Sequence, residues 1–491
     1  MTGNAEVDGL IVTQRQVVLT AHPLQRIGAF ALSALAAKLT GRGGNVRDPG
    51  DVPATDFDAA VERMIEDAVA AAEAGRLRAD SFWLKASGSF FPNSKMNHRS
   101  TLPMRSRAEN TARVRGWRTM PDPATWPQVP CALCGRAAVA FYGKVDVPLI
   151  DAAGYCNTTP RGHEGLALCW PCVCCFHALP YGSRLTGGPS AGVHSWDDEF
   201  LSTTTRSQVR RSAGEISGFG VARSAGRYEH ERTALLALRR YDRRLLAGVE
   251  VLVFSNYNLS ARLDIYRVDE ALAEWLRSTL RDPQRRRGWR ALLAAYQAPP
   301  VSGSRRLARD AFQRPWRILI TAAARLTDVP GPRAVLRFDA DLAALTYSYL
   351  REVMDVNQAD IDQVEALAAE IAQEIIADES AGPLMTFRVA SRRVVALQKW
   401  LENKAVRRAL RIGADERSAP LISTAQFRLL FDPDGQGWLY RRLLLIAVLN
   451  ALHKEGWRPA DAADAAADLP DPDQEVELAR EDDEMVEGIE Q

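Results

Sequence analysis

All seven cysteines of the 491-residue chain lie between Cys131 and Cys175. Four of them form two Cys-x-x-Cys pairs, Cys131 with Cys134 and Cys169 with Cys172. The turn of such a pair points both sulfurs at one ion, and four thiolates fit a tetrahedral zinc with bonds of about 2.3 Å. Four protein ligands leave no open position for a substrate. The sequence therefore predicts a structural Zn²⁺ site and not a catalytic one.

Other uses of these cysteines stay open from the sequence. Cys174 and Cys175 are alternative ligands. One Cys-x-x-Cys pair could serve redox chemistry. Alternatively, the site could have lost its function and hold no metal. Structural disulfides do not suit a cytosolic protein. Cys156 and His163, between the pairs, are more often packed or exposed than ligating. Gly135 follows the first pair, where such a turn often needs a residue with positive φ.

The charge of the chain is unevenly distributed. The net charge is +1, but residues 459–491 hold 13 acidic residues against one basic residue, Arg480, which leaves about +13 on residues 1–458. A basic body suits a polyanionic partner such as nucleic acid. A composition rich in Arg and Ala, with 62 Lys and Arg in total, also follows from a GC-rich genome, so charge alone does not decide the partner.

Periodicity predicts the elements that position the cysteines. Residues 20–40 form an amphipathic helix, and Phe57–Ala74 form a second. Prolines break a basic stretch over residues 87–126, and a Gly-, Ser-, Thr- and Arg-rich segment over 182–226 predicts a long loop. The expected buried stripe of the first helix is Leu24, Ile27, Phe30, Leu32 and Leu35.

The second half of the chain begins with a strand pair and ends in helices. We expect strands Val249–Phe254 and Arg262–Tyr266, joined by a turn at residues 255–258 and followed by a helix over 269–280. From Asp339 a helical bundle follows, with apolar residues at helical spacing. They are Ile361, Val364, Leu367, Ile371 and Ile375. Further helices are predicted at Phe387–Arg411, Thr424–Phe431 and Trp438–Lys454.

These elements predict a multidomain α+β protein, with a mixed N-terminal region that carries a four-cysteine zinc module and with a C-terminal helical bundle. The acidic tail is predicted to be disordered. The expected domains are an N-terminal region (1–125), the zinc module (126–183), a mixed region with a basic loop (184–338), the bundle (339–458) and the tail (459–491).

Four stretches, in this order, resemble the large subunit of type I-B CRISPR interference (Cascade) complexes, in its zinc-finger-bearing subfamily. The first is Thr20-Ala21-His22-Pro23-Leu24, leading into a helix with Gly28. The second is Ser89-Phe90-Phe91-Pro92-Asn93-Ser94. The third is the two Cys-x-x-Cys pairs, closed by Ala178-Leu179-Pro180-Tyr181-Gly182. The fourth is Val251-Leu252-Val253-Phe254-Ser255-Asn256, continued by Leu263-Asp264-Ile265-Tyr266.

The resemblance implies a non-catalytic subunit of a crRNA-guided DNA surveillance complex. It implies contact with the 5′ handle of the crRNA, recognition of the short motif (PAM) that flanks the double-stranded DNA target, and stabilisation of the R-loop. The implied protein partners are the backbone and small subunits, together with a helicase-nuclease in autonomous defence or transposition proteins in transposon-associated systems. Met354 precedes most of the bundle, and an internal start there is a hypothesis for a separate small subunit.

Two loops are candidates for reading the flanking motif, because Arg contacts guanine bidentately and Asn reads adenine. A solvated basic loop and an ordinary tight turn are the simpler interpretations. The first loop carries Asn93, Lys95, Asn97, Arg99, Arg105 and Arg107; the second carries Asn256 and Asn258. Three arginine clusters suit phosphates. They are Arg206, Arg210 and Arg211; Arg285, Arg286 and Arg287; and Arg407, Arg408 and Arg411.

No catalytic motif fits its context, and we expect no enzyme. Ser190 lies in a G-x-S-x-G pattern but without the expected strand before it, and His194 with Asp197 and Asp198 is a weak candidate for a nuclease metal site. Without a signal peptide or an apolar run of roughly 20 residues, the chain is expected to be cytoplasmic with no membrane partner. The alternative function is a zinc-stapled DNA-binding regulator or scaffold outside CRISPR systems.

Overall fold

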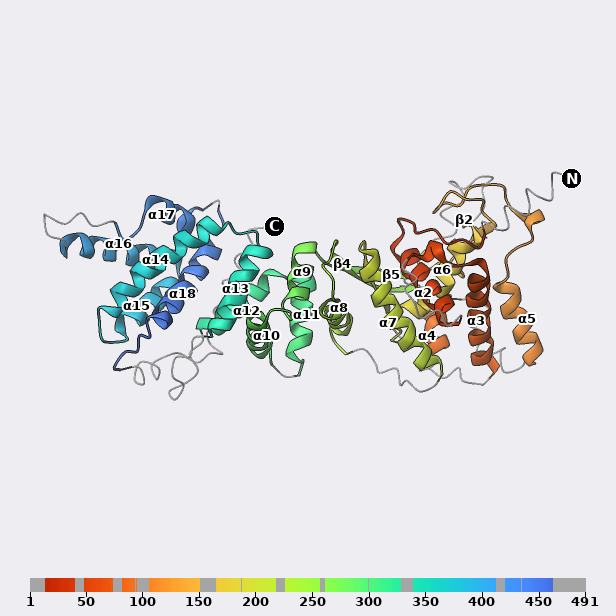
Figure 1. The fold of residues 1–491 in the computed structure, drawn as a ribbon, viewed down its shortest axis with the longest axis horizontal. Coiled ribbons are helices and arrows are strands. Elements are labelled where there is room, and N and C mark those ends of the chain that lie inside the picture. The colour runs from red at the N-terminus through yellow and green to blue at the C-terminus, as the bar shows by residue number, and fades with distance from the viewer. Residues whose placement is uncertain are drawn as a thin grey trace. The chain divides into compact units, whose positions relative to one another are not determined.

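The computed structural model describes residues 14–39, 48–73, 82–92, 94, 106–150, 165–186, 188–217, 226–256, 261–298, 300–327, 339–411, 420–433 and 435–461. The predicted α+β class is confirmed: helices dominate, and two small antiparallel sheets accompany them (Figure 1). The chain divides into two compact units, Met1–Arg277 with Ala311–Gln313, and Ser278–Asp310 with Arg314–Gln491. The division at Arg277 falls inside the region 184–338 that the sequence suggested as one domain.

Two helices form the centre of the N-terminal unit. Helix α2 (Pro23–Leu39) packs along α6 (Trp170–Gly182), every described side chain of which is buried. The predicted stripe of α2 is confirmed as core. Helix α3 (Ala54–Glu73), predicted from residue 57 onward, packs on α2 and on α5 (Arg107–Trp117). The short elements are η1 (Pro49–Asp51), α4 (Phe82–Ser89) and η2 (Pro123–Thr125).

A three-stranded sheet completes this unit. Strands β3 (Ser190–Ser195), β4 (Val249–Asn256) and β5 (Ala261–Val268) are antiparallel in that order, with Leu252 opposite Gly192 on one side and Ile265 on the other. The two predicted strands are confirmed, since they form β4 and β5. Helix α8 (Glu229–Arg240) packs on β4, and α9 (Glu270–Ser278) follows β5 in the chain. The bounds of α9 are close to those of the helix predicted at 269–280.

The predicted long loop over residues 182–226 is wrong. The segment contains β3 and the 19-residue helix α7 (Asp198–Ile216). Asp197 caps α7 by accepting from the N–H groups of Glu199 and Phe200, and the apolar residues that α7 does have are buried, among them Phe200 and Val209. The segment was predicted to be a loop because it is rich in Ser, Thr and Arg. Helix α7 has only a narrow stripe of buried apolar residues, so its helical periodicity is weak in the sequence.

The second unit is helical in its described residues. Helices α10 (Pro283–Ala295), α12 (Trp316–Thr327) and α13 (Ala340–Glu352) pack together, and α11 (Gly303–Gln313) divides between the two units at Ala311. Gly288 of α10 lies so close to α13 that an added Cβ would be 2.3 Å from the Asp341 carbonyl oxygen.

The C-terminal bundle follows within this unit. Helix α14 (Gln358–Ile376) buries its predicted stripe, largely against α18 (Gly437–Lys454). The helix predicted at 387–411 is two helices, α15 (Gly382–Ser391) and α16 (Val394–Arg411), and α17 (Thr424–Phe431) has its predicted bounds. Residues 462–491 of the acidic tail lie outside the described residues.

Candidate metal centre and nucleic-acid surfaces

The first cysteine pair sits in a hydrogen-bonded turn. Cys131 N–H donates to the Arg136 carbonyl at 2.6 Å, and Gly135 N–H donates to the Cys131 carbonyl at 2.9 Å. Gly135 has a φ of +76°, which confirms that this position requires the left-handed region. A backbone bridge between Pro130 and Ala137 closes the turn that carries Cys131 and Cys134.

The second pair lies at the start of a helix. Strand β1 (Ala140–Tyr142) pairs with β2 (Leu166–Leu168), and Cys169 follows β2 directly as the N-cap of α6. Pro171 is in the first turn, where its missing N–H costs nothing. Cys172 occupies the same turn, so two sulfurs lie at the positive end of the helix dipole, which favours thiolates.

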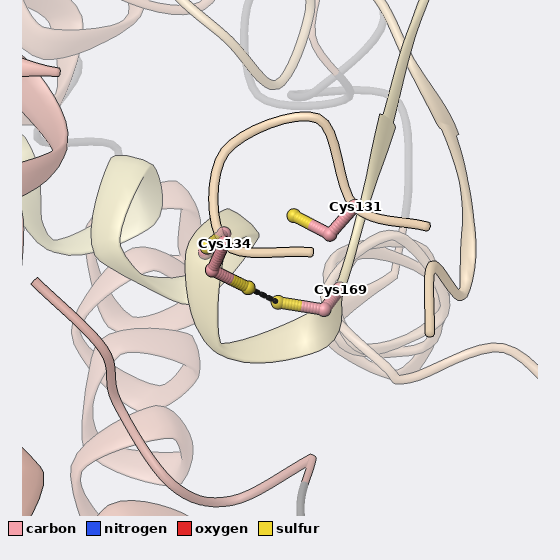
Figure 2. A group of neighbouring side chains, drawn as sticks. Cys131, Cys134 and Cys169 are labelled. Carbon is pink, nitrogen blue, oxygen red and sulfur yellow. Dashed lines mark hydrogen bonds between the residues drawn. The ribbon is translucent and has the colours of Figure 1, made fainter. Parts of the chain in front are cut away.

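The four sulfurs of Cys131, Cys134, Cys169 and Cys172 lie within 4.8 Å of one another. Figure 2 shows three of the side chains converging, with the sulfurs of Cys134 and Cys169 3.4 Å apart. Sulfurs at the corners of a tetrahedron with bonds of about 2.3 Å are about 3.8 Å apart, so the spacing fits. The group could hold a metal ion such as zinc. It is the one such group among the described residues.

Four thiolates at this spacing would need a cation between them. Mutual hydrogen bonds among the sulfurs lower the pKa of Cys131, whereas they raise the pKa of Cys172. Four adjacent sulfurs cannot all be ionised by themselves, because each thiolate raises the cost of the next. A divalent ion removes that conflict and permits four thiolates.

The alternative ligands lie elsewhere or outside the described residues. Cys174 and Cys175 are buried, and the Cys175 sulfur faces Gln25, whose Nε2 is 3.5 Å away. Both cysteines are absent from the sulfur cluster. Cys156 and His163 lie outside the described residues.

A buried glutamine that the sequence did not reveal joins the two halves of the centre. Gln14 Nε2 donates to the Ala137 carbonyl at 2.9 Å, and Gln14 Oε1 accepts from Trp170 N–H at 2.8 Å. The side chain therefore ties the first turn to the start of α6. Its partners are more than 120 residues away in sequence, so no local pattern could have identified it.

The arginines of α7 are the best placed of the predicted phosphate contacts. Arg210 and Arg211 are exposed and Arg206 is half-buried. Partial burial lowers the pKa of Arg211, as do the positive charges of Arg184 and Arg240, so the fold brings further arginines to this surface. Sequence reasoning missed both residues: Arg184 follows α6, forms a backbone bridge with Ala191 of β3 and pairs with Glu229, and Arg240 ends α8.

The arginines of α10 are partly committed to packing. Arg285 forms a bidentate ion pair with Glu352, and Arg287 pairs with Asp341 at 2.7 Å, so both tie α10 to α13. Arg286 is exposed.

On α16, Arg408 pairs with Glu370 of α14 at 2.6 Å. Arg407 is exposed and lines a cavity of about 440 Å³ together with Trp400 and Lys404. The other predicted contacts lie at helix ends or outside the described residues. Arg107 and Arg411 are the terminal residues of α5 and α16, and their side chains are outside the description. Asn93, Lys95, Asn97, Arg99, Arg105 and Asn258 lie outside the described residues.

Asn256 is buried and fully used inside the protein. Its Nδ2 donates to the carbonyls of Phe90 at 2.8 Å and Lys144 at 3.1 Å, and its Oδ1 accepts from Leu149 N–H at 3.0 Å. A side chain with these three partners cannot reach a base edge. We therefore remove Asn256 from the candidate base-reading residues.

Replacing Asn256 with alanine is expected to destabilise the N-terminal unit by about 3 kcal/mol, because each buried backbone group left without a partner costs roughly 1–3 kcal/mol. Urea unfolding measures the effect. Asn403→Ala, on an exposed face of α16, should change stability by no more than about 0.5 kcal/mol. An Asn256→Ala protein of normal stability that has lost sequence-dependent DNA binding would restore the base-reading role.

The polar residues near β3 do not form a second metal site. His194 is buried with its Nδ1 3.1 Å from Glu250 Oε2. Both carboxylate oxygens of Asp197 are used as acceptors, by the first turn of α7 and by Leu246 N–H, and Asp198 pairs with Arg26. Ser190 lies in β3 and not in a strand-to-helix turn.

A buried histidine on α6 makes stability depend on pH. Burial, reinforced by the charge of Arg118, lowers the pKa of His177 to about 4. Because the unfolded pKa is about 6.5, the native state stays unprotonated while the unfolded state gains a proton, and stability falls as pH drops from about 6.5 towards 4. Between pH 7 and 5 the wild type should lose about 2 kcal/mol more than His177→Gln in urea titrations. The exposed His453→Gln should match the wild type; equal losses in all three proteins would refute the assignment.

None of the helices in the described ranges is long and apolar enough to cross a membrane. Comparison with known proteins gave no match to any family model, curated protein or solved structure.

Proposed function

We propose that this chain is a non-catalytic, nucleic-acid-binding subunit of a crRNA-guided DNA surveillance complex, and that its four-cysteine centre holds a structural Zn²⁺. The zinc would fasten the start of α6 to the Cys131 turn, with no ligand position left for a substrate. The chain would contact the crRNA, read the motif beside the DNA target and stabilise the opened strands.

The observation that carries this proposal is that the four stretches behind the CRISPR resemblance meet in one core. The first stretch packs on the third: the His22 ring lies edge-on to Phe176 at 5.4 Å, and Gly28 lies against the Cys175 carbonyl of α6. Phe91 in the second stretch lies 6.1 Å from the His177 ring of α6.

The second and fourth stretches also join. The rings of Phe90 and Phe254 pack edge-on at 5.1 Å, and Asn256 donates to the Phe90 carbonyl. Residues of all four stretches therefore belong to one hydrophobic core, as expected if the stretches are signatures of a shared fold.

The arginines of α7, of which Arg210 and Arg211 are exposed and Arg206 is half-buried, supply the surface for phosphates. Replacing Arg206, Arg210 and Arg211 together with glutamine should weaken binding of single-stranded DNA, and the slope of log affinity against log salt should fall by roughly 0.7 for each lost phosphate contact. Fluorescence anisotropy over a salt series measures both. The unfolding midpoint should stay unchanged, because these side chains are not in the core.

A matched control removes the same charge from the same unit. Arg243, Arg262 and Arg267 are exposed, but each is ion-paired, with Glu199, Asp264 and Glu250 respectively. Their triple replacement by glutamine should leave the salt slope within error of wild type. If both triple variants weaken binding equally, net charge and not a defined surface drives the association.

Co-purification tests the proposal as a whole. The tagged chain would be expressed with its neighbouring genes, and bound protein and RNA identified. A stoichiometric complex with one guide-length RNA supports the subunit assignment. A lone, RNA-free protein with intact zinc would overturn it and leave a zinc-stapled DNA-binding regulator or scaffold as the better account.

A further inference from the structure

An exposed apolar face lies on α16. Val395, Val406 and Leu410 are 62%, 58% and 82% exposed. At 100° per residue they occupy one side of the helix, and Lys399 lies between them. Glu402, which accepts from Gln398 Nε2 at 3.0 Å, lies at the edge of the same side. Leu397 and Leu401 occupy the opposite, buried side. We call Val395, Lys399, Val406 and Leu410 the outer face of α16. Val389 and Val394 at the α15–α16 corner are also exposed, at 61% and 44%.

The surroundings of the outer face are basic. Residues 382–411, which form α15 and α16, contain eight basic residues and one acidic residue, Glu402. An exposed apolar stripe with a basic border is the complement of an acidic amphipathic segment. A second copy of the same face would bring like charges together, which disfavours self-association through it.

The chain carries such an acidic segment close by. Residues 462–491 contain twelve acidic residues and one basic residue. Within them Leu478, Met485 and Ile489 are spaced by seven and four, so the sequence pattern places them on one side of a helix, with Val486 adjacent.

The last described residues contact the start of α15. Ala460 N–H donates to the Glu379 carbonyl at 3.1 Å, and the Asp461 carboxylate accepts from Ala381 N–H at 2.7 Å. Residues 462–474 can span at most about 45 Å when extended, whereas the 18-residue α16, which packs on α15, is about 27 Å long. The acidic segment can therefore reach every position of the outer face.

We propose that the acidic segment 475–490 docks in cis on the outer face of α16. Leu478, Met485 and Ile489 cover Val406 and Leu410, and the segment's carboxylates face Lys399 and Arg407. Five of the ten exposed large apolar side chains of the described residues lie on α15 and α16, and the docked segment covers two of them.

Binding in trans tests the contact directly. The full chain would be shortened to end at Asp461, and a labelled peptide of residues 475–491 titrated into it by fluorescence anisotropy. We expect saturable binding that Val406→Asp with Leu410→Asp weakens at least tenfold. Leu246→Asp is the matched control, because Leu246 is 74% exposed in the other unit and should not affect binding. Absence of peptide binding, or equal loss in all variants, overturns the proposal.

Hydrogen exchange on the intact chain supplies a second measurement. Replacing Leu478, Met485 and Ile489 with serine keeps every charge of the tail, and α16 amides should then exchange several-fold faster than in the wild type. Replacing Ala465, Ala466 and Ala467 with serine is the control and should leave exchange unchanged. Unchanged α16 exchange in the first variant argues against docking. A mass that doubles with concentration, and does not double in Leu410→Asp, would assign the face to a second copy instead.

One consequence rests on the proposed function. Docking covers Arg407, so the chain that ends at Asp461 should bind single-stranded DNA more tightly than the full chain, and the added peptide should reverse the gain. If the peptide binds α16 but DNA affinity does not change, docking stands and the role of α16 in holding DNA falls. If DNA affinity changes without peptide binding, general charge repulsion by the tail explains it and the docking proposal falls.

Discussion

Replacing Cys172 with serine is expected to abolish metal binding and to unfold much of the N-terminal unit. The sulfur stands in the first turn of α6, where it would bind the ion together with the three other cysteine sulfurs of the cluster. Helix α6 is buried at the centre of the unit. A metal bound by Cys169 and Cys172 would hold the first turn of this helix in position. Binding of structural zinc contributes about 10–16 kcal/mol in small zinc domains, which equals or exceeds the roughly 5–15 kcal/mol of net stability in a typical domain.

Metal analysis and hydrogen exchange would measure the result. The wild type should carry one zinc per chain, and Cys172→Ser close to none, with fast exchange of the α2 and α6 amides. Helices of the second unit should keep their protection, because they form a separate core.

Cys174→Ala is the matched control. Cys174 lies two residues further along the same helix and is equally buried, but it is outside the sulfur cluster. It should retain one zinc per chain and lose only the roughly 1–2 kcal/mol of a small buried truncation. Loss of metal in Cys174→Ala would show that the ligand set is wrong, and a fully loaded Cys172→Ser would exclude this centre as the zinc site.

The features predicted correctly from the sequence are those encoded by neighbouring residues. The stripes of α2 and α14 follow from apolar residues three and four apart, which is a local property of a helix. The cysteine pairs could be identified because few other arrangements bring two thiols to one point within four residues. Gly135 was identified for the same reason, since its φ is set by the turn itself.

The features that were missed depend on contacts between distant residues. Helix α7 is polar on most of its surface, and only its packing on α2 and α6 shows that Leu201 and Val209 belong to the core. Asn256 has the residue type of a turn, yet its partners Phe90 and Lys144 are 166 and 112 positions away. Arg285 and Arg287 look like a basic patch until their acidic partners, 67 and 54 residues distant, are known. Charge clusters in sequence thus overstate the surface available to nucleic acid.

The addition of one methyl group between α2 and α6 is expected to destabilise the N-terminal unit strongly, although by less than loss of the metal. A Cβ added to Gly28 would lie 1.9 Å from the Cys175 carbonyl oxygen and 2.6 Å from its carbonyl carbon. These are backbone atoms of α6, so relief requires the two central helices to separate and not merely a side chain to move. Overpacking of a core costs typically 1–3 kcal/mol, and more when backbone must shift. We expect Gly28→Ala to destabilise the N-terminal unit by about 4 kcal/mol, against a helix-propensity gain of about 1 kcal/mol.

Gly214→Ala separates the steric effect from helix propensity. Gly214 is also inside a helix, α7, but an added Cβ would meet nothing within 4 Å. This variant should be more stable than wild type by about 0.5–1 kcal/mol, so the two Gly→Ala changes should shift the urea midpoint in opposite directions. Metal content distinguishes the causes further. Because α6 carries Cys169 and Cys172 at its start, displacement of α6 by Gly28→Ala should also weaken zinc retention against a chelator. A Gly28→Ala protein that is as stable as wild type would mean that α2 and α6 do not pack this closely, and the proposed common core of the four sequence stretches would lose its central contact.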